Sequence, residues 1–511
     1  MKPMSKIILN GEDLRVDELR EAAERGVPIE LSLESVKKIE KSRKYVENLV
    51  RDGRVVYGIT TGFGEFSSVN IPASDAAALQ KNLIISHAAG CGEYYAPVYV
   101  RAAMVLRVNA LAKGYSGISS KTLATLIGLV NAGITPRVPL HGSVGSSGDL
   151  VPLSHIVLAM MGEGDVEYKG KIVPAASALR SAGVAKAELS YKEGLALING
   201  TQMMTGVGAL LCARSFELVS IANVTAALST DALMGTPSAF NVLISRVRPH
   251  RGQLACSKEL TRLMEGSGIV NSHAECGEVQ DAYSLRCIPQ VHGAVLDSVN
   301  HVASVVTTEM NSATDNPLIF AAEGEVISGG NFHGEPIALV MDFLGIALSE
   351  LASISERRTD RLVNPNSNNN KLPAFLVEKG GLNSGFMIAQ YTSASIVSEN
   401  KVLAHPASVD SIPTSAGKED FNSMGSIAAK KCIRILENVE QVLAIELLAA
   451  CQGIDFRKPV KTSPRLMKIH SHVRKNIPFL KSDRVMYKDI AAAIEIIRSR
   501  EFAQIVKSVV K

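Results

Sequence analysis

The stretch Val442-Leu443-Ala444-Ile445-Glu446-Leu447-Leu448-Ala449-Ala450 decides the fold class of this 511-residue chain. It belongs to a helical pattern over roughly 424–452 that is apolar around much of its circumference. A helix of this kind is buried inside a bundle or at a subunit interface. Similar long patterns cover about 203–230, 293–310, 337–360 and 386–404, with no βαβ alternation and no internal repeat. We therefore predict a mainly α fold built around a bundle of long central helices.

The first part of the chain is patterned differently, with shorter elements and glycine-rich turns. Helical spacing occurs at about 36–50, 75–90, 97–113 and 119–132, and a small hairpin is expected at 166–173. No linker separates the two parts, because the one polar low-complexity patch, Asn364 to Asn370, is short enough to be a surface loop. We expect one unit over 1–511, with a smaller N-terminal region at about 1–200 and the helix bundle and C-terminal region over 201–511.

Composition excludes several classes of protein. The chain is 46% hydrophobic, Lys plus Arg exceed Asp plus Glu by only 54 − 50 = 4, and Trp is absent, so no nucleic-acid partner is expected.

Seven Cys without a CxxC pair indicate reduced thiols in the cytoplasm. The N-terminus lacks a signal-peptide core, and charges such as Arg214 and Glu217 interrupt the apolar runs, so we expect no membrane span. The eleven His show no metal-ligand spacing, and we predict no metal requirement.

The loop Gly142-Ser143-Val144-Gly145-Ser146-Ser147-Gly148-Asp149-Leu150 is the most unusual stretch of the chain. Taken alone, it is first of all a flexible turn before a helix that begins near Asp149. A phosphate-binding loop is a second interpretation, because backbone N–H groups at a helix N-terminus bind anions. The glycine spacing matches neither the dinucleotide fingerprint nor the Gly-Lys-Ser/Thr pattern, which disfavours that interpretation.

A third interpretation is chemical. Where the backbone folds back on itself, the amide nitrogen of Gly148 can attack the carbonyl carbon of Ser146, because glycine has no Cβ and tolerates strained dihedrals. Dehydration of Ser147 then leaves a methylidene group conjugated to an imidazolone, a strong electrophile that no ordinary side chain supplies. Ser147 is the better central residue, since a ring centred on Ser146 would need the hindered nitrogen of Ser147 as nucleophile.

The same loop, followed by Pro152-Leu153-Ser154-His155, resembles the signature of the aromatic amino acid ammonia-lyase family. Members carry a 4-methylidene-imidazol-5-one (MIO) group formed from Ala-Ser-Gly, and this chain has Ser146 where Ala is usual. Five further segments resemble the family in the same order: Tyr57 to Gly64, Glu193 to Thr201 (a strand-like motif), Gln280 to Arg286, Asn311 to Pro317, and Gly329 to Gly334. The resemblance implies a fumarase/aspartase-like long-helix fold, active-site loops in the N-terminal region, MIO from Ser146-Ser147-Gly148, and a homotetramer whose sites neighbouring subunits complete.

The resemblance also implies catalytic residues. Eliminating ammonia from an α-amino acid requires an electrophile, here centred on Ser147, and a base that reaches the β-carbon. Tyr57 and Tyr283 match the family's active-site phenols. We assign removal of the β-proton to Tyr283 and leave Tyr57 as the acid or gate.

Four more positions are expected to bind the substrate or the ring. Arg286 is the carboxylate clamp, because its guanidinium binds a carboxylate bidentately. Asn199 would donate a hydrogen bond to the ring or to the substrate carboxylate. Gln280 would support the same network, and Phe332 would pack near the ring and exclude water.

Two positions concern the substrate side chain. Ser86-His87 resembles the selectivity pair of the family's histidine-specific branch, although some tyrosine enzymes also have it. Glu419 occupies a position where that branch has Glu and the phenylalanine and tyrosine enzymes usually have Gln. A carboxylate can accept the N–H of an imidazole, for which a phenyl ring has no counterpart. The short segment Ser272 to Gly277 also resembles the histidine branch.

Other residues resemble the tyrosine enzymes instead. Phe421 stands where the histidine branch has His, and Glu65 resembles the tyrosine aminomutase pattern. We expect elimination of ammonia from L-histidine to give trans-urocanate. A tyrosine ammonia-lyase or tyrosine 2,3-aminomutase is the alternative within the family, and a non-catalytic helical scaffold is the alternative outside it.

Overall fold

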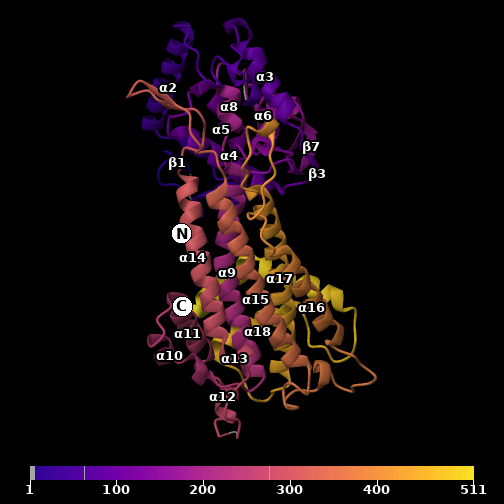
Figure 1. Cartoon of the computed structure of the whole chain (residues 1–511). Coiled ribbons are helices and arrows are strands. Elements are labelled where there is room, and N and C mark those ends of the chain that lie inside the picture. Colours follow the sequence, from indigo (N-terminus) through magenta and orange to yellow (C-terminus); the bar gives the residue numbers. More distant parts are fainter. Residues whose placement is uncertain (1–5, 63, 276) are drawn as a thin grey trace. The chain divides into compact units, whose positions relative to one another are not determined.

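The computed structural model describes residues 6–62, 64–275 and 277–511 (Figure 1). The chain forms two compact units, each built from segments distant in the sequence. The first unit comprises Met1–Ala213, Val302–Asp342 and Pro406–Lys430, and the second comprises Arg214–His301, Phe343–His405 and Lys431–Lys511. The partition that we expect near residue 200 remains a prediction. Phe63 and Cys276, which belong to two of the quoted segments, lie outside the described residues.

The first unit contains the shorter helices predicted from the first part of the chain. They are α1 (Val16–Arg25), α2 (Leu33–Arg51), α3 (Ala76–His87), α4 (Pro97–Ala112), α5 (Ser120–Ala132), α6 (Leu150–Met160), α7 (Ala175–Ala182) and α8 (Glu193–Ile198). Helix α4 is buried along most of its length and packs against α1, α2 and α5. Helices α3, α6 and α8 contact one another. The segment that we expected to be strand-like is thus helical: the apolar run Leu195-Ala196-Leu197-Ile198 forms the end of α8.

Short strands complete the first unit, and 3-10 turns occur in both units. The strands are β1 (Ile7–Leu9), β2 (Ile29–Leu31), β3 (Cys91–Tyr94), β4 (Thr135–Pro136), β5 (Pro139–His141), β6 (Asp165–Tyr168), β7 (Lys171–Pro174), β8 (Leu318–Phe320) and β9 (Glu325–Ile327). The 3-10 turns are η1 (Gly64–Ser68), η2 (Ala73–Asp75), η3 (Pro237–Phe240), η4 (Ala374–Leu376) and η5 (Ser415–Gly417). The predicted hairpin is confirmed as β6–β7, with Val166 opposite Val173.

The predicted long helices are confirmed. They are α9 (Gln202–Ala232), α14 (Ile288–Met310), α15 (Glu335–Val363), α16 (Met387–Leu403) and α17 (Gly425–Asp455). The second unit also contains α10 (Val242–Arg246), α11 (Arg251–Met264), α12 (Gly268–Ser272), α13 (Tyr283–Arg286), α18 (Pro464–Asn476), α19 (Met486–Arg498) and α20 (Arg500–Val510). The prediction of a mainly α fold built around long helices is therefore confirmed.

A buried polar network joins four of the long helices in the second unit, where they run side by side (Figure 1). Arg358 of α15 donates to both oxygens of Glu446 of α17, at 2.5 and 2.9 Å, and both side chains are fully buried. Ser229 of α9 donates to the same carboxylate at 2.7 Å, and His292 of α14 lies 3.4 Å from Arg358 Nη1. Because a buried charge is costly without partners, these contacts fix how the helices pair in this unit.

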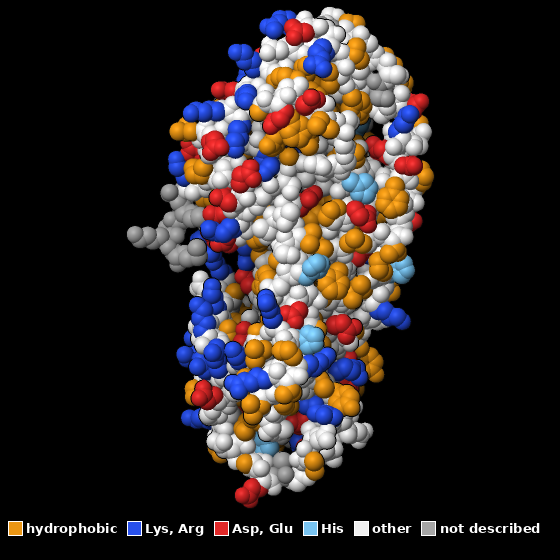
Figure 2. Space-filling model, turned by 60° about the vertical axis from the view of Figure 1, so that its left-hand side comes forward, with side chains coloured by type: hydrophobic (Ala, Val, Ile, Leu, Met, Phe, Trp, Pro, Cys, Tyr) orange, Lys and Arg blue, Asp and Glu red, His pale blue; other side chains and the backbone are white. Residues whose placement is uncertain are grey.

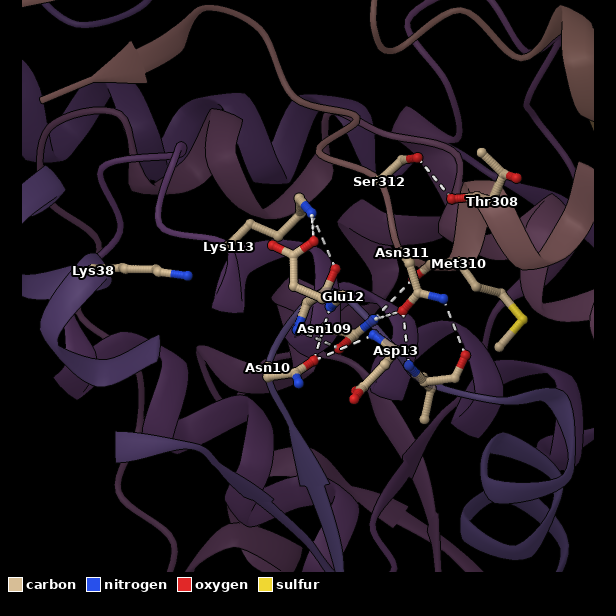
Figure 3. Close-up of polar contacts among 12 residues, drawn as sticks. Asn10, Glu12, Asp13, Lys38, Asn109, Lys113, Thr308, Met310, Asn311 and Ser312 are labelled. Carbon is tan, nitrogen blue, oxygen red and sulfur yellow. Dashed lines mark hydrogen bonds and ion pairs between the residues drawn. The ribbon is translucent and has the colours of Figure 1, made fainter. Parts of the chain in front are cut away.

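A second polar cluster fixes the segment that leads from α14 towards the candidate site (Figure 3). Asn311 Oδ1 accepts hydrogen bonds from Leu14 N at 2.9 Å and from Asn109 Nδ2 at 3.1 Å. Asn109 Nδ2 also donates to Met310 O, and its Oδ1 accepts from Gly11 N. The start of the segment 311–317 is thereby anchored to α4 and to the N-terminal loop.

The surface combines charged and hydrophobic side chains. Both signs of charge are intermixed with hydrophobic side chains on the face in Figure 2. Helices α9 and α15 are long and apolar enough to cross a membrane by length and composition, but 72% and 67% of their most apolar windows are buried. Such burial is typical of the core helices of a folded protein. Four of the six described cysteines are buried, and all six are free thiols.

Candidate active site

The serine-containing loop turns through two glycines with positive φ. Gly145 has φ +69° and Gly148 has φ +68°, a region that side-chain-bearing residues rarely adopt. A Cβ on Gly148 would lie 2.2 Å from the carbonyl oxygen of Gly200, and the backbones of the two glycines form a bridge. The position therefore requires glycine both for its conformation and for its close approach to Gly200.

Asp149 fastens this loop to the start of α9 and to the start of α17. Its fully buried carboxylate accepts hydrogen bonds from Met204 N at 2.9 Å and from Ser426 Oγ at 2.8 Å, while its backbone N–H donates to Gly200 O at 2.7 Å. Burial raises the pKa of Asp149 to about 6, and the hydrogen bonds from Met204 and Ser426 oppose that rise. The loop is thus held by backbone atoms of Met204 and Gly200 on one side and by the Ser426 hydroxyl on the other.

Glu419 lies directly against the two serines. Ser146 Oγ donates to Glu419 Oε2 at 2.6 Å, and Ser147 Oγ donates to Oε1 at 3.0 Å. Thr414 Oγ1 also donates to Oε2, at 3.0 Å. A carboxylate that accepts several hydroxyl donors is held in one orientation. The structure thus brings together the ring-forming serines and the carboxylate that the sequence associated with substrate selection.

Tyr57 and His87 are half-buried in the same unit and lie close enough to Glu419 for its charge to act on both. Burial raises the pKa of Tyr57, a backbone hydrogen bond with Gly64 lowers it, and the charge of Glu419 raises it further. Burial lowers the pKa of His87, while a backbone contact with Leu83 and the charge of Glu419 act in the opposite direction. A protonated phenol and a neutral imidazole at neutral pH follow from these shifts.

Asn199 ends α8 beside the loop and is almost fully buried. Its Nδ2 donates to Asn316 O at 3.4 Å, and its Oδ1 has no hydrogen-bond partner among the described residues. Asn316 in turn holds the loop before Phe332, because its Oδ1 accepts from Gly329 N at 2.8 Å. Phe332 is half-buried in this unit. An unpartnered buried amide oxygen is costly, and as an acceptor it is satisfied only by a donor such as an N–H group.

A buried ion pair supports Asn316. Lys192 Nζ donates to Asp315 Oδ2 at 2.7 Å, with both side chains at most 2% exposed. Asp315 Oδ1 accepts from Asn316 N at 2.7 Å. Burial lowers the pKa of Lys192, and the charge of Asp315 raises it. This chain of contacts runs from Lys192 to Asn199 through the 311–317 segment.

The other three predicted site residues, Tyr283, Arg286 and Gln280, belong to the second unit. Tyr283, the first residue of α13, is 70% exposed, and the guanidinium carbon of Arg286 lies 4.5 Å from the centre of its ring. Arg286 Nε is buried without a hydrogen-bond partner among the described residues. Gln280 lines a hollow of about 370 Å³ that also includes Asp281 and Arg361. Tyr283, Arg286 and Gln280 are thus close together in the chain, and their roles remain predictions.

The geometry of the loop fits a self-formed MIO group. Gly148 is confined to glycine by the Gly200 carbonyl, and Asp149 anchors the loop to the starts of α9 and α17. Sequence reasoning missed the anchoring residues Asp149, Thr414 and Lys192. For Asp149 the sequence signal points elsewhere: an acidic residue before an apolar helix suggests an N-cap, but its carboxylate makes no capping bond to α6 and accepts from Met204 N instead. For Lys192 none existed, since an isolated lysine usually indicates a solvated position.

Comparison with known proteins identifies the family of the chain. The family model described as aromatic amino acid lyase matches residues 14–475. A histidine ammonia-lyase of Alkaliphilus oremlandii is 51% identical over 508 residues, covering 99% of this chain and 100% of that protein. The crystal structure of histidine ammonia-lyase from Trypanosoma cruzi has a TM-score of 0.92 at 45% identity, covering 99% of this chain and 96% of that one. A tyrosine aminomutase structure from Streptomyces globisporus has a TM-score of 0.93 at 38% identity, covering 98% of each chain. The chain belongs to the aromatic amino acid lyase family.

Proposed function

We propose that this protein eliminates ammonia from L-histidine to give trans-urocanate, a carbon–nitrogen lyase reaction. The observation that carries the proposal is the contact of the Glu419 carboxylate with both Ser146 and Ser147, at 2.6 and 3.0 Å. A negative acceptor at that point suits a substrate side chain that carries an N–H. The relatives named histidine ammonia-lyase, at about half identity over the full length, support the same substrate.

The electrophile in this proposal is MIO, formed from Ser146, Ser147 and Gly148. When present, MIO supplies an electron-poor methylidene carbon that activates the substrate for loss of ammonia. Glu419 would accept the imidazole N–H, and Asn199 would bind the ring or the substrate carboxylate through its amide. Tyr57, whose pKa burial raises, keeps its proton at neutral pH and serves as acid or gate. Phe332 would exclude water.

Tyr283, Arg286 and Gln280 would complete the site: Tyr283 as the base for the β-proton, Arg286 as the carboxylate clamp, and Gln280 in support. Tyr283 is largely exposed, and the Nε of Arg286 is buried without a partner in the described part of the chain. Both features suit side chains whose contacting groups belong to another subunit. We propose that these residues come from neighbouring subunits of a homotetramer.

The surface of two long helices supports such an assembly. Leu339, Phe343 and Ile346 are 42% to 53% exposed on α15, and Ile388 and Tyr391 are 57% and 65% exposed on α16. Their spacing of three or four residues places the members of each set on one face of their helix. Exposed apolar stripes of this kind mark contacts with other chains. We expect a cytoplasmic enzyme that acts without a metal, a membrane or a nucleic acid.

Tyrosine is the alternative substrate, because one apolar contact would serve either amino acid. Phe421 stacks on His333 with ring centres 6.0 Å apart and planes 17° from parallel, next to Phe332 in the sequence. An apolar ring at this point suits a phenol substrate as well as an imidazole.

The test is ultraviolet absorbance of the purified full-length protein with L-histidine and, separately, with L-tyrosine. We expect a urocanate band with histidine only, and an intact mass two water molecules below that of the unmodified chain. A coumarate band with tyrosine only would reassign the substrate. An unmodified mass with no turnover of either amino acid would refute the lyase proposal.

A further inference from the structure

The two oxygens of Glu419 are held by different hydroxyls. Oε2 accepts from Ser146 Oγ at 2.6 Å and from Thr414 Oγ1 at 3.0 Å. Oε1 accepts from Ser147 Oγ at 3.0 Å. Ser146 is 9% exposed, so its hydroxyl has little access to water as an alternative partner.

These hydroxyls have different fates under the proposed ring formation. Gly148 N bonds to the Ser146 carbonyl carbon, and that carbonyl oxygen leaves as water with the amide protons of Ser147 and Gly148. The Ser147 hydroxyl leaves as a second water with the Ser147 Cα proton. The Ser146 side chain takes no part in either step. Ring formation therefore removes the donor at Glu419 Oε1 and leaves both donors at Oε2.

Thr414 is itself fixed in direction. Its backbone pairs with that of Glu419 through Thr414 N to Glu419 O at 2.9 Å and Glu419 N to Thr414 O at 3.3 Å. Its Oγ1 accepts from Nδ2 of Asn422, a residue only 1% exposed, at 3.3 Å. Because that hydroxyl has a single proton, the bond from Asn422 leaves the proton for Glu419. The Thr414 donor is thus directed at Oε2 by its surroundings.

We propose that Ser146 and Thr414 are positioning residues that hold Glu419 Oε2, so that Oε1 is presented to the imidazole N–H of the substrate. The proposal rests on the proposed function and adds to it two residues that select the substrate through Glu419. A carboxylate held by one oxygen needs little reorganisation when the other accepts the substrate. It also gives the serine at position 146 a role beyond lending its carbonyl to the ring.

Removal of either hydroxyl should weaken recognition of the imidazole without preventing ring formation. The variants are Ser146→Ala and Thr414→Val, with Ser154→Ala and Thr125→Val as matched controls. The control hydroxyls are also buried, but they donate to Leu150 O and Ala185 O. We expect about 2–10-fold lower kcat/KM for histidine in each test variant, with unchanged near-ultraviolet ring absorbance and intact mass. The controls should match the unaltered protein.

A binding measurement distinguishes positioning from general damage. The dissociation constant of urocanate, measured by titration calorimetry, should rise by a similar factor in S146A and T414V. In a Glu419→Ala background the same substitutions should leave that constant unchanged, because they act through Glu419. If T414V does not fold, S146A alone decides, since it is a small deletion in the loop.

Two outcomes would overturn the positioning role: test variants equal to the unaltered protein, or the same loss of urocanate binding with and without Glu419. A failure of the proposed function looks different. In that case the unaltered full-length protein would show neither ring absorbance nor histidine turnover.

Discussion

Replacing Gly148 by alanine perturbs the candidate site at the point of closest backbone approach. The added Cβ would lie 2.2 Å from the oxygen and 2.3 Å from the carbon of the Gly200 carbonyl, which is backbone and cannot rotate away. The residue also has φ +68°, which costs a side-chain-bearing residue about 1–2 kcal/mol. Forced shifts around an overpacked site add about 1–3 kcal/mol. We expect Gly148→Ala to lower the free energy of unfolding by about 2–5 kcal/mol.

Gly133→Ala is the matched control for this substitution. Gly133 has the same φ, +68°, but nothing lies within 4 Å of the position that its Cβ would take. Its loss should therefore be limited to the conformational cost of about 1–2 kcal/mol, with ring absorbance retained. Urea unfolding and near-ultraviolet absorbance of both variants are the assays. A Gly148→Ala protein with ring absorbance and the stability of Gly133→Ala would refute the steric argument.

Three further predictions follow from contacts of the first unit. Glu419→Gln should lower kcat/KM for histidine by about 10–100-fold, because it removes a hydrogen bond to a charged group. A steady-state assay in which the variant is as active as the unaltered protein would contradict this. Lys192→Met leaves the Asp315 carboxylate buried and unpaired, so the free energy of unfolding should fall by about 3–5 kcal/mol in a urea titration; a loss below about 1 kcal/mol would argue that water reaches the pair. The folded state raises the pKa of Asp149 to about 6, so the stabilising contribution of its proton is complete below about pH 4 and is lost as the pH rises through 6. The stability of the unaltered protein relative to Asp149→Asn should therefore fall by roughly 3 kcal/mol from pH 4 to pH 7, and a constant difference would exclude this titration.

The helical architecture was predictable because it depends on local patterns. The long helices follow from apolar spacing that persists over many turns, as in α9 and α17. The error occurred at α8, whose four-residue apolar run is too short for periodicity to distinguish helix from strand. Local signals therefore identified the elements that are long and misjudged one that is short.

The site was predictable only in part. The chemistry of Ser147-Gly148 can be argued from the residues, but Ser147 and Glu419 are 272 positions apart and no spacing rule joins them. Resemblance to the family supplied that connection. The Lys192–Asp315 pair gave no sequence signal, because whether a lysine is buried depends on tertiary packing that a single sequence does not contain. The roles that we propose for Tyr283, Arg286 and Gln280 likewise came from the resemblance rather than from local pattern.

The discontinuous make-up of the first unit has a consequence for biosynthesis. Its last segment, Pro406–Lys430, supplies Glu419 and also Met424, whose N–H donates to Val144 O at 2.8 Å beside the serine loop. Until the ribosome has added this last segment, the serine loop lacks its contacts with Glu419 and with Met424 N. Ring closure should therefore wait until most of the polypeptide has been translated. Nascent chains stopped before residue 406 should keep the unmodified mass, however long they are incubated.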